Sequence, residues 1–342
     1  MVDRAAVDRA AADRAADVLV ILDGASEPLG EKPTSLERAH TPVLDRLATE
    51  GTVTSLRTVP PGLLAGSETA IPGLLGWTPD APVDRGAIEA AAHAIEVDDG
   101  ERAWRVDRRD RADAGASAQT LERVLAERLP RRRSAQRQRV HHLTGHRMLI
   151  VGLDPTATLA GELFEIDLRA GLLGADLRVW PAGVIPPRVL GEDTVVIGAQ
   201  GAAIGIARLM GARTIVPPDA TGRPGSDLAA KATAALTVIG DVSRVVVHVG
   251  APDEAAHERD ADAKVAAIEA ADALLLAPLT AALRARGGTL RVCPDHGCDP
   301  ATGRHDDRPV PCVDWPAADA AQASGGRLTE RAILAGLTAV AA

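Results

Sequence analysis

The feature that most constrains this chain is an alternation of short apolar runs with helical patterns. The apolar runs occupy residues 17–22, 194–197, 214–216, 244–249 and 289–293. Compact apolar runs of this length are typical of buried strands in a parallel sheet. The helical patterns lie at residues 41–50, 202–210, 226–239 and 260–286. The alternation predicts an α/β fold with a doubly wound sheet, in which ligands bind beyond the carboxyl ends of strands.

A stretch in the middle of the chain breaks this alternation. Residues 81–190 contain a basic run at 131–139 and a proline-rich segment at 181–187, with few clear strands or helices. We interpret 81–190 as an inserted second domain, between the two parts of an α/β domain at 17–80 and 191–342. A length of 342 residues agrees with two domains. Residues 1–16 repeat Asp-Arg-Ala-Ala, and we expect them to form a flexible arm.

The composition disfavours several classes of protein. A net charge of −9 argues against non-specific nucleic-acid binding, and the basic run 131–139 is short enough to be a solvated surface. No apolar run approaches the roughly 20 residues that a membrane span needs. The three cysteines fit a reducing compartment better than a disulfide framework. We therefore expect a cytoplasmic protein that binds neither nucleic acid nor membrane; the oligomeric state stays open.

Residues of the types that bind metals follow the apolar runs at several places. Asp23 comes directly after the first run, and Ser67 lies in a Gly-Ser-Glu-Thr segment behind a Pro-Pro-Gly turn. The others follow the fourth and fifth runs: Asp253, His257, Asp295, His296 and His305. Taken singly, each has a simpler interpretation as a turn residue, a helix cap or a surface pair. Taken together, carboxylates and imidazoles suit divalent metals such as Mn²⁺ and Zn²⁺.

Ser67 is the candidate nucleophile of this group. A serine hydroxyl is weak at neutral pH, and coordination to a metal ion lowers its pKa. Two ions about 4 Å apart would hold the attacking and leaving oxygens of an in-line phosphoryl displacement. The N–H groups of a helix that begins near Ser67 would favour a phosphate there.

The motifs and their order point to a known family. The segment KPTSLERAHTP occupies residues 32–42, GSETA occupies 66–70, and APDEAAH at 251–257 precedes Asp295, His296 and His305. Together with Asp23-Gly24 they resemble the archaeal type of cofactor-independent phosphoglycerate mutase, a member of the alkaline phosphatase superfamily. The resemblance covers about residues 17–315, and its motifs are most specific at the two ends.

The resemblance implies an alkaline-phosphatase-like α/β domain with an inserted α+β cap domain. It also implies two divalent metal ions, with Mn²⁺ expected and Zn²⁺, Mg²⁺ or Co²⁺ as alternatives. One ion would be held by Asp23, Ser67, Asp295 and His296, and the other by Asp253, His257 and His305. Ser67 would accept the phosphoryl group of a small phosphorylated substrate and return it to the neighbouring hydroxyl. The implied reaction interconverts 3-phosphoglycerate and 2-phosphoglycerate.

The residues that would handle the substrate are less specific. Arg85, Arg105 and Arg147 are candidates to bind the substrate carboxylate, because a guanidinium holds carboxylates in a bidentate fork. His248 is close enough in sequence to contact the substrate or a metal ligand. The chain departs from the family at PDHGC, residues 294–298, where the family usually has Ala-Asp-His-Ser-Thr. Cys298 could approach a metal there, but a small buried thiol is the simpler interpretation.

Three alternatives stay open at this stage. The same chemistry could act on a phosphonate or phosphinate analogue of phosphoglycerate, since the substrate-handling residues are altered. Water could take the phosphoryl group, which would make the chain a phosphomonoesterase or phosphodiesterase. The chain could also be a metal-binding regulatory protein, although an intact Ser67 argues against that.

Overall fold

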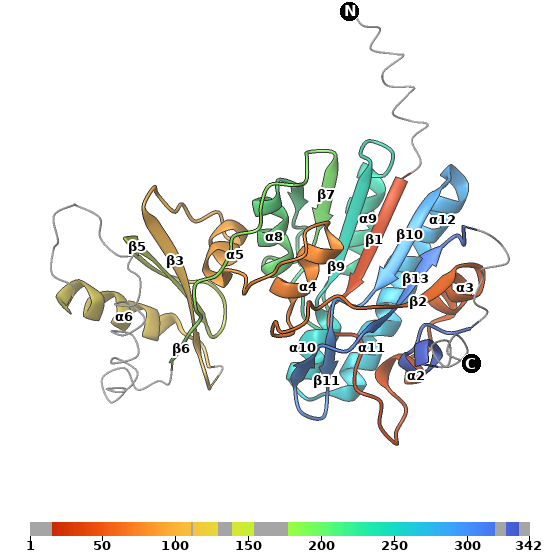
Figure 1. The fold of residues 1–342 in the computed structure, drawn as a ribbon, viewed down its shortest axis with the longest axis horizontal. Helices are drawn as coiled ribbons and strands as arrows, with labels where there is room; N and C mark the ends of the chain where they lie inside the picture. Colours follow the sequence, from red (N-terminus) through yellow and green to blue (C-terminus); the bar gives the residue numbers. More distant parts are fainter. Residues whose placement is uncertain (1–15, 111, 129–138, 154–176, 319–325, 335–342) are drawn as a thin grey trace, which may run out of the picture. The chain divides into compact units, whose positions relative to one another are not determined.

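The computed structural model describes residues 16–110, 112–128, 139–153, 177–318 and 326–334. The predicted arm, apart from Ala16, and the basic run, apart from Arg139, lie outside the described residues. The chain forms two compact units (Figure 1): the first unit comprises Met1–Asp80 with Pro186–Ala342, and the second unit comprises Ala81–Ile185.

The first unit is built on a seven-stranded sheet with the strand order β2-β13-β10-β1-β9-β7-β8. In chain order the strands are β1 (Ala16–Leu22), β2 (Thr52–Leu56), β7 (Thr194–Ile197), β8 (Arg213–Ile215), β9 (Arg244–Val249), β10 (Gly288–Cys293) and β13 (Val310–Trp315). Strands β10, β1, β9, β7 and β8 run parallel, as predicted. The sequence did not reveal β13, which is antiparallel to both β10 and β2 and makes the sheet mixed.

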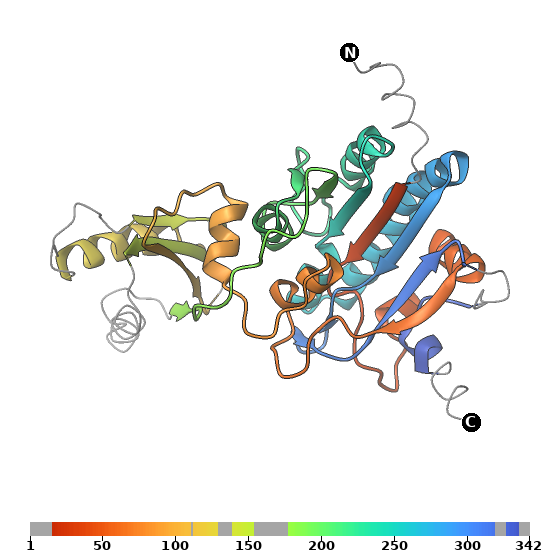
Figure 2. The same ribbon diagram turned by 45° about the horizontal axis from the view of Figure 1, so that its top comes forward.

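Helices and a short hairpin complete the first unit. The helices are α2 (Ser35–Arg38), α3 (Pro42–Glu50), α4 (Ser67–Leu74), α8 (Ala202–Met210), α9 (Leu228–Val238), α10 (Ala251–His257), α11 (Ala261–Ala271), a π-helical turn (Asp272–Leu276) and α12 (Ala277–Arg286). The hairpin pairs β11 (Gly297–Asp299) with β12 (Arg304–Asp306). The core lies where alternate strand residues such as Val18, Val20 and Val245 meet apolar residues of α3, α9, α11 and α12. Figure 2 shows the sheet and the helices beside it.

One helical segment in the described part of the chain, Ala261–Arg286, is long and apolar enough to cross a membrane by length and composition. Its residues Ile268, Leu275 and Leu279 are buried in the core of the first unit. Because these three side chains are already buried in the protein, we interpret the segment as a core helix.

The second unit is an α+β insertion. Its four-stranded antiparallel sheet has the order β4-β5-β3-β6. The strands are β3 (Glu101–Arg108), β4 (Arg139–His142), β5 (Arg147–Leu153) and β6 (Leu177–Val179), and the helices are α5 (Arg85–Ala92) and α6 (Gly115–Arg128). Successive residues of β3 point to opposite faces of this sheet: Ala103 packs with Ala90 of α5, and Trp104 packs with Leu121 of α6.

Candidate active site

The carboxyl ends of three neighbouring parallel strands carry the candidate ligands. Asp23 follows β1, Asp253 lies in the first turn of α10 just after β9, and Asp295 follows β10. Because β1 pairs with β9 on one side and β10 on the other, these carboxylates meet at one edge of the sheet. The three aspartates are nearly or fully buried.

Gly24 lets the chain after β1 lie close to the segments that carry Asp253 and Asp295. Its φ is +60°, and a Cβ at this position would lie 2.5 Å from Oδ1 of Asp253. Its N–H donates to Oδ1 of Asp295 at 3.1 Å. Only a glycine combines this left-handed conformation with so close a contact, so the Asp-Gly pair after β1 holds the Asp253 and Asp295 segments together.

Each of three histidines is oriented by a backbone carbonyl. The Nδ1 atoms of His257, His296 and His305 lie 2.9, 3.2 and 3.1 Å from the carbonyl oxygens of Gly303, Gly297 and Ala65. A carbonyl oxygen only accepts, so each Nδ1 carries the proton and each Nε2 offers a lone pair in the neutral ring. This is the usual orientation of metal-binding histidines.

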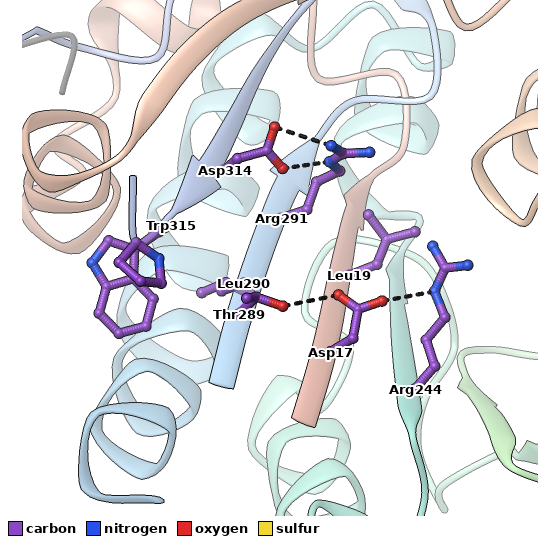
Figure 3. A pocket seen from close by; sticks show the side chains of 9 residues that line it. Asp17, Leu19, Arg244, Thr289, Leu290, Arg291, Asp314 and Trp315 are labelled. Carbon is purple, nitrogen blue, oxygen red and sulfur yellow. Dashed lines mark hydrogen bonds and ion pairs between the residues drawn. The ribbon is translucent and has the colours of Figure 1, made fainter. Parts of the chain in front are cut away.

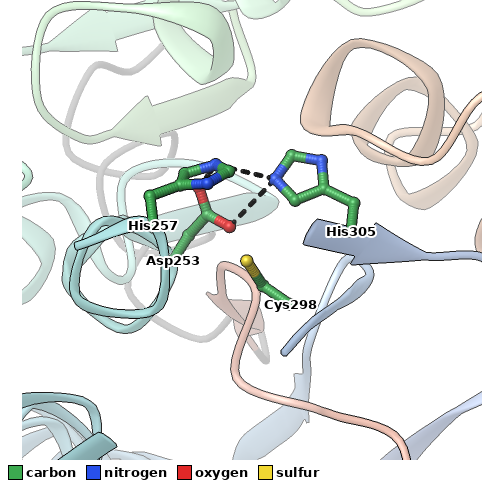
Figure 4. A group of neighbouring side chains, drawn as sticks. All are labelled: Asp253, His257, Cys298 and His305. Carbon is green, nitrogen blue, oxygen red and sulfur yellow. Dashed lines mark hydrogen bonds and ion pairs between the residues drawn. The ribbon is translucent and has the colours of Figure 1, made fainter. Parts of the chain in front are cut away.

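The first cluster of side chains lies on α10 and the β11–β12 hairpin (Figure 4). Nε2 of His257 and Nε2 of His305 are 2.9 Å apart. They lie 3.2 and 3.1 Å from the two carboxylate oxygens of Asp253. Two lone pairs and a carboxylate cannot meet at these distances without a shared cation, which is either a proton or a metal ion.

The second cluster surrounds Asp23 and includes the hydroxyl of Ser67. Ser67 Oγ lies 3.4 Å from Oδ1 of Asp23 and 3.5 Å from Nε2 of His296. His248 places its Nε2 3.1 Å from Oδ2 of Asp23. Oδ2 of Asp295, a fully buried side chain, accepts no hydrogen bond from the described part of the chain.

The titration of these groups reflects crowded charges in a buried place. Burial raises the pKa of Asp23 well above its usual value, and the charges of Asp295 and Asp253 raise it further. Burial also acts to raise the pKa of Asp253, but its contacts with His257 and His305 hold that pKa well below the usual value. Burial alone would lower the pKa of His305, but its contact with Asp253 raises it to about 9.

His248 behaves differently from His305. Burial lowers the pKa of His248 to about 4, so its ring is neutral at physiological pH. The ring therefore brings no positive charge to the cluster around Asp23.

The donor set fits divalent cations. Three overlapping groups have their ligand atoms within 4.8 Å of one another: Asp253 with His257, Cys298 and His305; Asp23 with Asp253 and His296; Asp23 with His248 and Asp295. Carboxylate oxygens and imidazole nitrogens are the donors that such ions take in proteins. A cation among them would remove the repulsion between the carboxylates.

Comparison with known proteins identifies the family. The model of the Metalloenzyme superfamily matches residues 16–341. A 2,3-bisphosphoglycerate-independent phosphoglycerate mutase of Archaeoglobus fulgidus is 30% identical, over 86% of this chain and 88% of that protein. This chain belongs to that family of metalloenzymes. A second such mutase, from Methanothermobacter thermautotrophicus, is 28% identical over 86% of this chain and 87% of its own length.

Solved structures show that the fold is that of this mutase family. A protein from Pyrococcus horikoshii covers 94% of this chain and 92% of its own, with a TM-score of 0.73 and 22% identity. The cofactor-independent phosphoglycerate mutase of Thermoplasma acidophilum covers 96% and 100%, with a TM-score of 0.55 and 18% identity. The predicted α/β fold class is thereby confirmed.

The three candidate arginines all lie in the second unit. Arg105 is buried and donates to both carboxylate oxygens of Asp107 at 2.9 and 3.1 Å, and to Glu89 at 2.7 Å. Its bidentate fork is thus occupied within the second unit, which favours a structural role for Arg105. The guanidinium carbon of Arg85 lies 3.7 Å from the ring centre of Trp180.

Arg147, the third candidate, begins β5 and pairs with Asp107 of β3 in the sheet register. This register places Arg147 opposite Asp107, the residue that Arg105 contacts. As a substrate-binding residue it stays a prediction, as does Arg85.

Sequence reasoning gave His248 only a loose role and favoured an inert thiol for Cys298. His248 lies in β9, four residues after Arg244, and the alternation of the strand puts it on the same face as Val246. Strand alternation beside Asp23 was the signal that could have placed it in the cluster. For Cys298 the signal was its spacing of two residues from His296 in a short strand.

The opposite end of the same sheet holds a pocket of about 330 Å³ (Figure 3). Nine residues line it: Asp17, Leu19, Arg244, Thr289, Leu290, Arg291, Asp314, Trp315 and Pro316. Arg291 forms a two-pronged contact with Asp314 at 2.6 and 3.0 Å, and Arg244 lies 3.3 Å from Asp17. Since these charges neutralise one another, the pocket is a poorer candidate for catalysis than the buried clusters.

Proposed function

We propose that this enzyme is a metal-dependent phosphoryl mutase, an isomerase that interconverts 3-phosphoglycerate and 2-phosphoglycerate through a phosphoserine on Ser67. The observation that carries the proposal is the place of the Ser67 hydroxyl, 3.4 Å from Asp23 and 3.5 Å from His296. A nucleophile beside buried metal-ligand types, in a chain of this family, is the arrangement that phosphoryl transfer needs.

The clusters suggest how two ions would be held. Asp23, Ser67, Asp295 and His296 would bind one, and Asp253, His257 and His305 would bind the other. His248, 3.1 Å from Asp23, would adjoin the first set. The ions would lower the pKa of the Ser67 hydroxyl and neutralise the phosphoryl oxygens during in-line transfer. Mn²⁺ is the ion expected, with Zn²⁺, Mg²⁺ and Co²⁺ as alternatives.

The protein's own groups would position the phosphoryl group. Ser67 is the first residue of α4, so it lies at the positive end of the helix dipole, toward which the backbone N–H groups point. These groups favour a phosphate on Ser67. Because the phosphoserine keeps the phosphoryl group on the enzyme, it can be returned to the other hydroxyl of the same glycerate without a free bisphosphate.

Three further expectations belong to this proposal. Residues 81–190 would form a cap that excludes water, and Arg85 and Arg147 would bind the substrate. We also expect a cytoplasmic location, because the described cysteines are all free thiols.

The proposal is tested with purified protein, Mn²⁺ and 3-phosphoglycerate, followed by phosphorus NMR. We expect 2-phosphoglycerate to form in the wild type. Ser67→Ala should lose activity on the order of 10⁶-fold, as other enzymes do when their serine nucleophile is removed. The same variant should still bind metal, because the carboxylates and imidazoles remain. Wild-type rates in Ser67→Ala would eliminate the covalent route, and inorganic phosphate as the product would indicate a hydrolase.

A further inference from the structure

Cys298 is held rigidly beside the first cluster. Its backbone N–H donates to the carbonyl of Ser26 at 2.8 Å, and its own carbonyl accepts from Lys264 Nζ at 2.7 Å. Lys264 is fully buried and also contacts Glu27 at 2.9 Å. The backbone of β11 is therefore fixed on both sides of the cysteine, and its side chain has little freedom to turn away.

The thiol points at the Asp253 cluster (Figure 4). Its Sγ and the ligand atoms of Asp253, His257 and His305 all lie within 4.8 Å of one another. Cys298 is fully buried, and so are Cys293 and Cys312, which belong to none of the candidate metal groups found among the described residues. Oδ1 of Asp253, also buried, lies 3.1 Å from Nε2 of His305.

We propose that the Cys298 thiolate is a fourth protein ligand of the ion held by Asp253, His257 and His305. The inference rests on the metal site in the proposed function and adds a ligand to it. The thiol proton leaves to solvent when the sulfur–metal bond forms. The resulting set has one sulfur, two nitrogens and one oxygen, which suits four-coordinate Zn²⁺ or Co²⁺.

A sulfur ligand changes which metal this site prefers. Thiolates favour softer ions such as Zn²⁺, whereas Mn²⁺ prefers oxygen donors. The site of Asp23, Ser67, Asp295 and His296 has no sulfur among its proposed ligands. The two sites should therefore differ in metal preference, with Zn²⁺ held more tightly beside Cys298.

The test compares Cys298→Ser with the wild type and with Cys312→Ala. Cys312 is a buried thiol on β13, outside the candidate ligand groups, so its variant controls for the general loss of a cysteine. Each protein is stripped of metal and titrated with Co²⁺ in an absorption spectrometer. We expect a thiolate-to-cobalt charge-transfer band in the wild type and in Cys312→Ala, and none in Cys298→Ser.

Competition titrations give the second readout. Zn²⁺ affinity at this site should fall at least about tenfold in Cys298→Ser, the lower range for removing a residue that only supports a ligand. Mn²⁺ affinity should change little. A cobalt band of equal strength in Cys298→Ser and wild type, or no band in the wild type, would overturn the proposal.

A measurement on the wild type covers the case in which Cys298→Ser fails to fold. X-ray absorption of the Zn²⁺-loaded protein should show a sulfur at about 2.3 Å from zinc, beyond the nitrogen and oxygen shell at roughly 2.0–2.1 Å. A shell of nitrogen and oxygen alone would rule the sulfur out. Neither measurement depends on turnover: a protein with the sulfur signature but no mutase activity keeps this inference and loses the proposed function.

Discussion

The two ends of the seven-stranded sheet carry similar charged residues in opposite arrangements. At the amino ends of β1, β9 and β10, each arginine lies against an aspartate, as in the pair Arg291–Asp314 (Figure 3). At the carboxyl ends, the charge of Asp295 raises the pKa of the nearby Asp23, and imidazole nitrogens face one another. Paired charges need nothing further, whereas crowded buried anions and lone pairs need a cation. The comparison teaches that arrangement, more than composition, distinguishes a metal site from a surface ion pair.

The largest effect should come from neutralising a carboxylate at the carboxyl end. Asp23→Asn removes a charge that contacts Ser67, His248 and His296. We expect mutase activity to fall on the order of 10⁴-fold, or about 5 kcal/mol of transition-state stabilisation. Phosphorus NMR measures the rate. Asp314→Asn at the other end is the matched control and should stay near the wild-type rate; equal losses in both variants would break the comparison.

A somewhat smaller effect is expected when a side chain is placed between the segment after β1 and Asp253. Gly24→Ala places a methyl group against Asp253 and forces a positive φ, so we expect about 4 kcal/mol of destabilisation from overpacking and strain. Gly62→Ala is the control, since its φ is +83° but nothing lies within 4 Å of the added carbon. It should cost only the roughly 1–2 kcal/mol of the left-handed conformation. Denaturant unfolding measures the loss in free energy of unfolding for both variants. Equal losses would refute the close contact between Gly24 and Asp253.

The third prediction concerns pH in the metal-free protein. Burial acts to lower the pKa of His305, but the contact with Asp253 raises it from 6.5 to about 9 in the folded state, so the protonated ring takes the place of a cation there. Its stabilising contribution is complete below pH 6.5 and disappears as the pH rises through 9, at most about 3 kcal/mol.

Thermal unfolding between pH 6.5 and 9, with and without metal, measures this change. A bound ion replaces the proton, so the metal-loaded protein should lack the decline. His305→Asn should remove it from the metal-free protein. If the metal-free protein keeps constant stability over this range, His305 does not share a proton with Asp253.

The smallest effect should come from the amino end. Arg291→Ala breaks a pair whose side chains are 45% and 40% exposed. Exposed pairs contribute about 0.2–1 kcal/mol, and salt weakens them. Unfolding at low and high salt measures the loss, and metal affinity should not change. A loss above about 2 kcal/mol, or weaker metal binding, would mean that the two ends are not independent.

The sequence predicted the parts of the fold that have a strong local signal. Runs such as 194–197 and 244–249 coincide with β7 and β9, because buried parallel strands are continuously apolar. Strand β13 was missed because it is antiparallel and contains Pro311, so neither a crossover helix nor a clean apolar run marks it.

The candidate site was predictable where a ligand follows a strand, as Asp23 and Asp295 do. What the sequence could not supply is which atoms share a centre. The orientation of Cys298 depends on Lys264 and Ser26, which are far from it in the chain. The occupied fork of Arg105 was in principle predictable, because Arg105 and Asp107 are two residues apart and share one face of β3.

The most direct test of the central claim is to trap the phosphoenzyme. Metal-loaded and chelated samples are mixed with 3-phosphoglycerate, quenched in acid and digested, and the peptide that contains Ser67 is analysed by mass spectrometry. The account predicts phosphate on Ser67 in the metal-loaded sample and none in the chelated one. Turnover to 2-phosphoglycerate with no phosphate on Ser67, or phosphorylation that survives metal removal, would contradict it.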